Sequence, residues 1–253
     1  MTIIQVADAQ LGFDVAVKGQ VPGAEYVNDL TYEIEYLTKA VQKINNLMPD
    51  VVVFTGDQVH LPNDAEQWEN FLKIASQINE SIKVFYLPGN HDVLIGGNVV
   101  NYSPFTNALG EDRFVYEDKG VMLLGINSSL IMAGDESEAQ QKEWMAEQLS
   151  KGDPDDVKLV FGHHPFFVEN IDEEDTYHQL PKAKRMEYFD IFTANGVDAL
   201  YAGHLHESAS GEYQGIKVRT TTSSAYQLGA SKPSLRKITI GNGTTICDEF
   251  IEL

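Results

Sequence analysis

The chain has 253 residues, of which 43% are hydrophobic and 22% are charged, an ordinary composition for a globular protein. Its formal net charge of −20 argues against nucleic acid and anionic membranes as partners, because both would be repelled. No apolar run is long enough to span a membrane, the N-terminus lacks the layout of a secretory signal, and Cys247 is the single cysteine. We therefore expect a cytoplasmic protein without a disulfide framework, folded as one domain over residues 1–253.

The first half of the chain alternates between predicted strands and helices, as α/β proteins do. Apolar runs predict strands at 3–7, 51–54 and 82–87. The second of these has the continuous apolar character of a central parallel strand, and the third is expected to be buried. Apolar residues at spacings of three and four predict helices at 28–46 and 64–79, and a loop rich in glycine and proline (12–23) precedes the first helix.

The second half is expected to be less regular at first. Residues 96–110 are rich in turn formers and predict an irregular insertion. Further strands are predicted at 114–116, 121–124, 157–161 and 198–201. Helices are predicted at 137–149, with a capping box formed by Ser137 and Gln140, and at 182–195, with Gly196 at the C′ position. The alternating segment 212–253 predicts a closing β-meander.

Five predicted strands end directly before side chains that commonly bind metals. These side chains are Asp8 and Gln10, Asp57, Asn90 and His91, His163, and His204 and His206. Each signal is weak alone: a Gly-Asp pair is more often a turn, and Gly-Asn-His-Asp at 89–92 also fits a polar surface loop. Because ligands of α/β proteins bind at the carboxyl ends of strands, five such ends together predict one convergent metal site.

The donor types narrow the choice of metal. Carboxylate, amide and imidazole donors without thiolate favour Mn²⁺, Fe²⁺, Co²⁺ or Zn²⁺. The donors are too many for one ion, so we expect two ions roughly 3.5–4 Å apart that share a bridging carboxylate. On an extended segment His204 and His206 would point to the same side, whereas the adjacent His163 and His164 would point to opposite sides, so that only one of the latter pair faces the metals.

These motifs, in this order along nearly the whole chain, resemble the motif series of the calcineurin-like metallophosphoesterases. The stretches 56–60, 169–175 and 223–229 further resemble the branch typified by complete S-transactivated protein 1, also called calcineurin-like phosphoesterase domain-containing protein 1. The resemblance implies an α/β fold, a four-layer αββα sandwich of the metallophosphoesterase type, and hydrolysis of phosphate esters by a two-metal mechanism.

The resemblance also implies roles for individual residues. One metal would be bound by Asp8, Gln10, Asp57 and His206. The second would be bound by Asp57, Asn90, His163 and His204. Asp57 would bridge the two ions, His91 would be the catalytic histidine beside the substrate phosphate, and Asp92 would hold the ring of His91. Manganese is the ion expected to support activity best in vitro.

Gln10 departs from the commonest pattern of this family, which has histidine at that position. A neutral amide oxygen is the weaker ligand, and His60, three residues after Asp57, is a candidate to compensate. Two interpretations stay open: His60 binds the first metal, or it supports that site through a hydrogen bond.

The predicted substrate is a phosphorylated small molecule or a phosphoprotein. The branch resemblance favours a phosphomonoesterase acting on phosphoserine or phosphothreonine. The alternatives are a phosphodiesterase or nucleotide diphosphatase and, from another class, a non-catalytic metal-binding interaction scaffold. Two divalent ions, partly neutralised by Asp8 and Asp57, would make the pocket cationic inside an anionic protein. The sequence predicts no particular oligomeric state.

Overall fold

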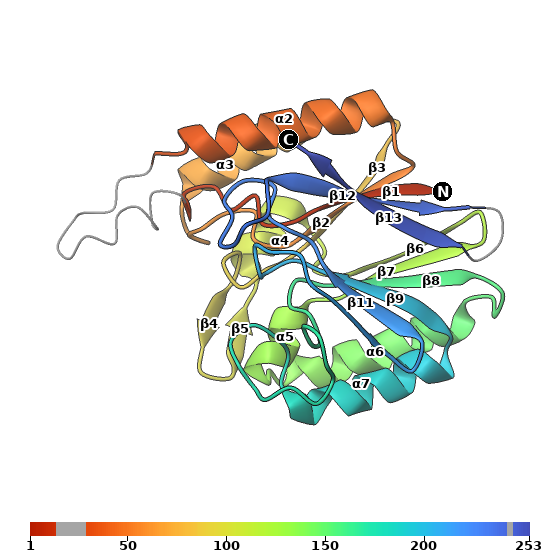
Figure 1. Ribbon diagram of the computed structural model, residues 1–253. Coiled ribbons are helices and arrows are strands. Elements are labelled where there is room, and N and C mark those ends of the chain that lie inside the picture. The colour runs from red at the N-terminus through yellow and green to blue at the C-terminus, as the bar shows by residue number, and fades with distance from the viewer. Residues whose placement is uncertain (14–28, 242–244) are drawn as a thin grey trace.

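Two β-sheets pack face to face, and helices cover both outer faces (Figure 1). The computed structural model describes residues 1–13, 29–241 and 245–253. Most of the predicted loop 12–23 and the expected helix start at residue 28 lie outside these ranges. The layers run helices, sheet, sheet, helices, so the predicted αββα sandwich is confirmed.

The first sheet combines strands from both ends of the chain in the order β13-β12-β1-β2-β3. These strands are β1 (Thr2–Val6), β2 (Val51–Thr55), β3 (Lys83–Leu87), β12 (Ser234–Ile240) and β13 (Ile246–Glu252). β1, β2 and β3 are parallel, whereas β12 and β13 join by antiparallel pairing. Two amphipathic helices bury their apolar faces on the outer side of this sheet: α2 (Thr31–Leu47) and α3 (Ala65–Ala75).

The second sheet has the order β10-β11-β9-β8-β7-β6. Its strands are β6 (Phe114–Asp118), β7 (Val121–Gly125), β8 (Val157–Phe161), β9 (Val197–Ala202), β10 (Ser210–Tyr213) and β11 (Ile216–Thr220). Its outer face packs against α5 (Ser128–Ala133), α6 (Ser137–Lys151) and α7 (Lys182–Ala194). The space between the two sheets is filled by aliphatic and aromatic side chains such as Ile3, Val53, Leu123, Leu159 and Phe161.

The parallel strands of both sheets end on the same side of the sandwich. Figure 1 shows the loops that follow them gathered on the left of the view, where a small hairpin also lies. The hairpin consists of β4 (Leu94–Gly96) and β5 (Val99–Asn101), and the helix α4 (Ser103–Leu109) follows it. This edge therefore collects the strand-end side chains, as expected for an α/β protein.

Several sequence-based expectations need correction. The strand after α3 is an edge strand that is only partly buried, because β3 pairs with β2 alone within the described chain. Residues 96–110 form ordered elements, namely part of the β4–β5 hairpin and α4. Helix α6 lacks the predicted capping box, because Ser137 is already helical and its N–H donates to Asp135 at 2.8 Å.

The C-terminal strands also differ from the predicted meander. β10 and β11 extend the second sheet, and β11 is parallel to β9, whereas β12 and β13 complete the first sheet. The helix predicted at 182–195 is confirmed as α7, and Gly196 has the expected left-handed conformation with φ of 68°. Across the ranges that the structure covers, no helix is both long and apolar enough to cross a membrane.

Candidate metal centre

Five of the predicted ligands lie in left-handed backbone conformations. The structure gives positive φ to eight non-glycine residues within the described ranges, and five of these are Asp8 (51°), Gln10 (39°), Asp57 (53°), His204 (71°) and His206 (52°). The left-handed region costs a non-glycine residue about 1–3 kcal/mol and persists where surrounding contacts enforce it, often at functional sites. His204 and His206 are therefore not on an extended segment as expected, although both rings reach the centre.

Glycines allow the strand-end loops to approach one another closely. A Cβ atom on Gly89 would lie 2.0 Å from Oδ1 of Asp57, and one on Gly203 would lie 2.6 Å from Oδ2 of Asp8. No real Cβ tolerates such distances, so the carboxylates occupy space that only glycine leaves open. This contact explains why the polar motifs at two of the strand ends begin with glycine.

Donor atoms from three strand ends converge on one nitrogen, which belongs to a fourth strand end. Nε2 of His163 lies 3.0 Å from Oδ1 of Asn90, 3.2 Å from Nδ1 of His204 and 3.3 Å from Oδ2 of Asp57. His163 is fully buried, and the other three side chains reach it from different loops. The arrangement brings together all four residues predicted for the second metal.

Backbone carbonyls fix the orientation of each of these imidazoles from behind. Nδ1 of His163 lies 2.9 Å from the carbonyl oxygen of Thr55, and Nε2 of His204 lies 2.9 Å from that of Tyr177. Nδ1 of His206 lies 2.6 Å from the carbonyl oxygen of Tyr226. A carbonyl only accepts, so the ring nitrogen facing it carries a hydrogen. The opposite nitrogen of each ring can then present a lone pair to the centre, which is the arrangement of metal-binding histidines.

Three of the four residues predicted for the first metal, Asp8, Asp57 and His206, also lie together. Oδ1 of Asp8 lies 3.7 Å from Nε2 of His206, and ligand atoms of Asp8, Asp57 and His163 lie within 4.8 Å of one another. Oε1 of Gln10 is buried and accepts no hydrogen bond from any part of the chain that the structure describes. Leaving a buried acceptor unsatisfied costs about 1–3 kcal/mol. A cation would satisfy this oxygen, so the residues present fit a metal ion at this position.

The electrostatics of the centre favour positive charge. Asp8 and Asp57 are both buried, and burial raises the pKa of Asp8. Burial opposes ionisation of Asp57 too, but the charges of His163 and His91 outweigh it and lower the pKa of Asp57. Burial disfavours a charged His163, yet the charges of Asp57 and Asp8 prevail and raise its pKa to about 9. The two carboxylates therefore stabilise a cation at the point where the donor atoms meet.

His91 is held differently from the way the resemblance implied. Its backbone N–H donates to Oδ1 of Asp57 at 2.9 Å, and its Nδ1 lies 2.9 Å from the carbonyl oxygen of His60. The ring of His60 stacks on that of His91, with the centroids 4.7 Å apart. His60 is in neither of the groups of His, Cys, Asp and Glu side chains that converge as possible metal ligands within the described ranges.

Asp92 likewise has partners other than the predicted one. It is fully buried, and its carboxylate accepts backbone N–H groups from Gln58 (2.9 Å), Val59 (3.2 Å) and Gly89 (2.8 Å). The structure therefore corrects the expectation that Asp92 holds the ring of His91. Asp92 instead ties the loop after β2 to the loop after β3, and the His60 carbonyl orients the catalytic candidate.

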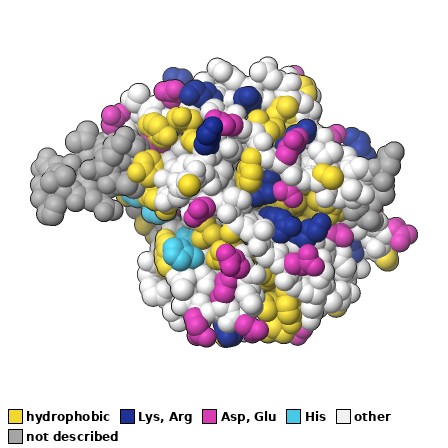
Figure 2. Space-filling view, in the orientation of Figure 1, with side chains coloured by type: hydrophobic (Ala, Val, Ile, Leu, Met, Phe, Trp, Pro, Cys, Tyr) yellow, Lys and Arg dark blue, Asp and Glu magenta, His cyan; other side chains and the backbone are white. Residues whose placement is uncertain are grey.

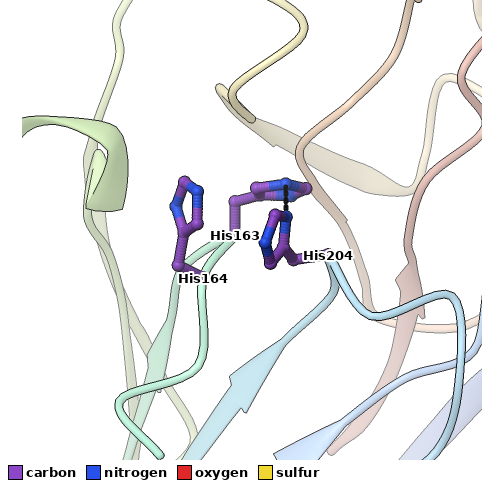
Figure 3. Close-up of side chains that lie close together, drawn as sticks. All are labelled: His163, His164 and His204. Atoms are coloured by element: carbon purple, nitrogen blue, oxygen red, sulfur yellow. Dashed lines mark hydrogen bonds between the residues drawn. The ribbon is translucent and has the colours of Figure 1, made fainter. Parts of the chain in front are cut away.

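His164 lies closer to the centre than its position in the sequence indicated. One ring nitrogen from each of His163, His164 and His204 lies within 4.8 Å of the others (Figure 3). The expectation that His164 points to the opposite side is thus wrong. Nδ1 of His164 lies 3.0 Å from the hydroxyl of Ser128, which holds this ring beside the other two.

Two aromatic residues at the centre were missed in the sequence. The hydroxyl of Tyr177 lies 3.1 Å from Nδ2 of Asn90, and its ring centroid lies 4.9 Å from that of His204. Phe13 packs its ring 4.9 Å from that of His206. Neither residue belongs to a segment with a repeating apolar pattern, so no local signal distinguished them from other aromatic residues.

Comparisons with known proteins agree with this geometry. Residues 1–208 match the family model described as calcineurin-like phosphoesterase. A protein of Bos taurus named serine/threonine-protein phosphatase CPPED1 is 32% identical over 222 residues, which cover 82% of this chain and 70% of that protein. This relative is of the calcineurin-like phosphoesterase domain-containing type that the three further stretches indicated.

Two solved structures share the fold. A dimetal phosphatase from Danio rerio aligns with all of this chain and 98% of its own, at 14% identity and a TM-score of 0.63. A purple acid phosphatase from Lupinus luteus gives a TM-score of 0.72 at 13% identity, and this chain spans 51% of its length. The chain belongs to the calcineurin-like phosphoesterase family and is a hydrolase of phosphate esters that uses divalent metal ions.

Proposed function

We propose that the centre binds two divalent ions in two overlapping ligand sets. The first set is Asp8, Gln10, Asp57 and His206, and the second is Asp57, Asn90, His163 and His204. The unsatisfied Oε1 of Gln10 supports the first set, and the convergence of donor atoms on Nε2 of His163 supports the second. Asp57 belongs to both sets and would bridge the ions. Manganese suits these oxygen and imidazole donors and is the ion we expect to activate the protein in vitro.

The proposed reaction is hydrolysis of phosphomonoesters, with phosphoserine and phosphothreonine of proteins as substrates. One observation carries the reaction class: three imidazoles are each fixed from behind by a backbone carbonyl, and their other nitrogens lie toward a centre with two buried carboxylates, next to Asp57 for His163, next to Asp8 for His206 and next to His163 for His204. The substrate class rests on the Bos taurus relative, which is named a serine/threonine-protein phosphatase. Phosphodiester hydrolysis remains the alternative, and the assay below distinguishes the two.

The metal ions and the side chains around the centre have separate roles in the proposed reaction. Bound divalent ions supply Lewis-acid activation of the phosphoryl group and of water. The Nδ1–H of His91 donates to the His60 carbonyl, so the proton given to the leaving oxygen would come from Nε2–H of the doubly protonated ring, which becomes neutral in the transfer. Stacking on His60 keeps the ring of His91 in place for this transfer.

Residues 1–253 are proposed to act as one domain in the cytoplasm. β12 and β13, from the C-terminal end, complete the sheet that β1 begins, so the centre depends on both ends of the chain. Cys247 lies exposed on β13, where a free thiol is compatible with a reducing compartment.

The decisive assay compares a phosphomonoester with a phosphodiester. Protein stripped of metal and reloaded with Mn²⁺ is given p-nitrophenyl phosphate and bis(p-nitrophenyl) phosphate in parallel. Turnover of the monoester that depends on Mn²⁺ and exceeds turnover of the diester supports the proposal. Preference for the diester would move the function to a phosphodiesterase, and no turnover of either ester by metal-loaded protein would leave a metal-binding scaffold.

A further inference from the structure

A cavity of about 570 Å³ lies beside the candidate metal centre. Leu205, one of its wall residues, stands between the ligands His204 and His206, and another, His178, directly follows Tyr177. The carbonyl of Tyr177 holds His204 from behind, so the wall of the cavity and the ligand shell share the same loops. A group bound in this cavity would therefore lie next to a phosphate bound at the metals.

The cavity is acidic. Three of its wall residues are Glu173, Glu174 and Glu207, and no lysine or arginine lines it within the described ranges. The carboxylate of Glu173 accepts three backbone N–H groups, which outweigh its partial burial and lower its pKa. The carboxylate of Glu174 is 94% exposed and lies 3.8 Å from the ammonium of Lys182, an exposed pair whose attraction is weak.

The same cavity offers apolar surface beside the carboxylates. Val168, Leu205 and Leu228 contribute to its wall, and Leu228 is 60% exposed. An apolar wall with acidic groups at its edge suits a side chain that has a long aliphatic stem and a cationic head. Lysine and arginine are the side chains with this construction.

The charge of the whole protein favours the same kind of ligand. With a net charge of −20 the protein repels an anionic substrate at long range, and the metal centre attracts phosphate only at short range. Figure 2 shows Asp and Glu side chains to be more widespread than Lys and Arg over the lower half of the face in view, where α6 and α7 lie. Basic residues around the phosphate group would turn this repulsion into attraction.

We propose that the cavity binds a lysine or arginine side chain of the phosphoprotein substrate, located within a few residues of the phosphorylated serine or threonine. This inference rests on the proposed function, because it supplies the substrate specificity of the same metal centre. Glu174 and Glu207 recognise the cationic head, and Leu205 and Leu228 contact its aliphatic stem.

The test uses short synthetic phosphoserine peptides that differ only in the flanking residues, which are arginine, alanine or glutamate. Wild-type protein loaded with Mn²⁺ is expected to hydrolyse the arginine peptide with kcat/KM about tenfold above that of the alanine peptide. The glutamate peptide should be the poorest substrate. Raising the salt concentration from about 50 mM to about 300 mM should reduce the difference without removing it.

The double substitution Glu174→Gln and Glu207→Gln removes charge from the cavity and replaces none of the proposed metal ligands. It should bring the arginine and alanine peptides to nearly equal kcat/KM and leave hydrolysis of p-nitrophenyl phosphate unchanged. Glu80→Gln, which removes one exposed charge elsewhere, serves as the control and should retain the preference. Equal kcat/KM values in the wild type, or a preference retained in the double variant, would overturn the inference.

Measurements of peptide binding test the role of the cavity independently of the proposed phosphatase activity. Calorimetry with the unphosphorylated arginine and alanine peptides reports on the cavity without any turnover. Tighter binding of the arginine peptide, lost in the double variant, supports the cavity even if no phosphomonoester is hydrolysed. Hydrolysis of p-nitrophenyl phosphate with equal affinities and equal kcat/KM values for the two peptides would retain the function and refute the cavity.

Discussion

The amide nitrogen of Asn90 and the hydroxyl of Tyr177 lie 3.1 Å apart, across 87 residues of sequence. The same tyrosine accepts a hydrogen bond from Nε2 of His204 through its backbone carbonyl. Tyr177 therefore supports two of the side chains proposed to bind one metal ion, and its hydroxyl determines which end of the Asn90 amide faces that ion.

Tyr177→Phe removes the hydroxyl and keeps the backbone carbonyl and the ring. Without the hydroxyl, Nδ2 of Asn90 loses its partner at 3.1 Å and the amide is oriented less firmly, so we expect the affinity for one of the two ions to fall about tenfold. Calorimetric titration of metal-free protein with Mn²⁺ would measure both affinities. Two unchanged affinities would show that Asn90 is oriented without help from Tyr177.

Substitutions of the adjacent residues His91 and Asp92 should have different effects, the first on turnover and the second on stability. His91→Asn is expected to reduce kcat on p-nitrophenyl phosphate by about 10²–10⁴-fold and to leave both ions bound. Asp92→Asn places an amide among three backbone N–H donors and should lower the free energy of unfolding by about 1–3 kcal/mol. Urea denaturation of the metal-loaded proteins, run beside the activity assay, distinguishes the two effects. If Asp92→Asn lost as much turnover as His91→Asn without being destabilised, Asp92 would instead orient His91.

Gly89→Ala tests the close approach of the strand-end loops. The added methyl group would lie 2.0 Å from Oδ1 of Asp57, so the loop after β3 must shift. We expect a loss of about 1–3 kcal/mol in stability together with loss of Mn²⁺ binding. Gly96→Ala is the matched control, because its Cβ would meet no atom within 4 Å in the described structure. Thermal unfolding with and without Mn²⁺ measures both effects, and normal Mn²⁺ binding by Gly89→Ala would contradict the geometry.

The metal content of two single variants tests whether Gln10, which replaces the common histidine of the family, binds a metal and whether His60 does so too. Gln10→Ala should lose one of two ions, because it removes the buried oxygen that would bind it. His60→Ala should retain both ions and turn over about tenfold more slowly, because His60 packs against His91 and not among the converging donors. Elemental analysis of the purified proteins gives the counts. A single ion in His60→Ala would establish His60 as a ligand.

Much of the centre is predictable from the sequence because its side chains follow apolar strands directly. Asp57 comes after the fully buried β2 and His163 after the fully buried β8, and parallel strands bring such ends to one edge. Most of the longer helices and strands are also predictable, since the spacing of apolar residues is local, whereas the short elements β4, β5, α4 and α5 were not predicted.

The remaining features depend on contacts between distant segments. The partners of Asp92 are backbone groups of another loop, and the support of Asn90 by Tyr177 bridges separate parts of the chain. The partial exposure of β3 depends on which strands pair, and not on its own apolar composition. No periodicity within a segment carries such information.

Stability and function make opposite demands on five residues in left-handed conformations: Asp8, Gln10, Asp57, His204 and His206. Glycine at any of these positions would relieve backbone strain while deleting a proposed metal donor. A library selected for thermostability alone would therefore enrich such replacements and accumulate inactive, robust proteins. Engineering this chain for stability should leave these five positions unvaried and seek its gains in the outer helices.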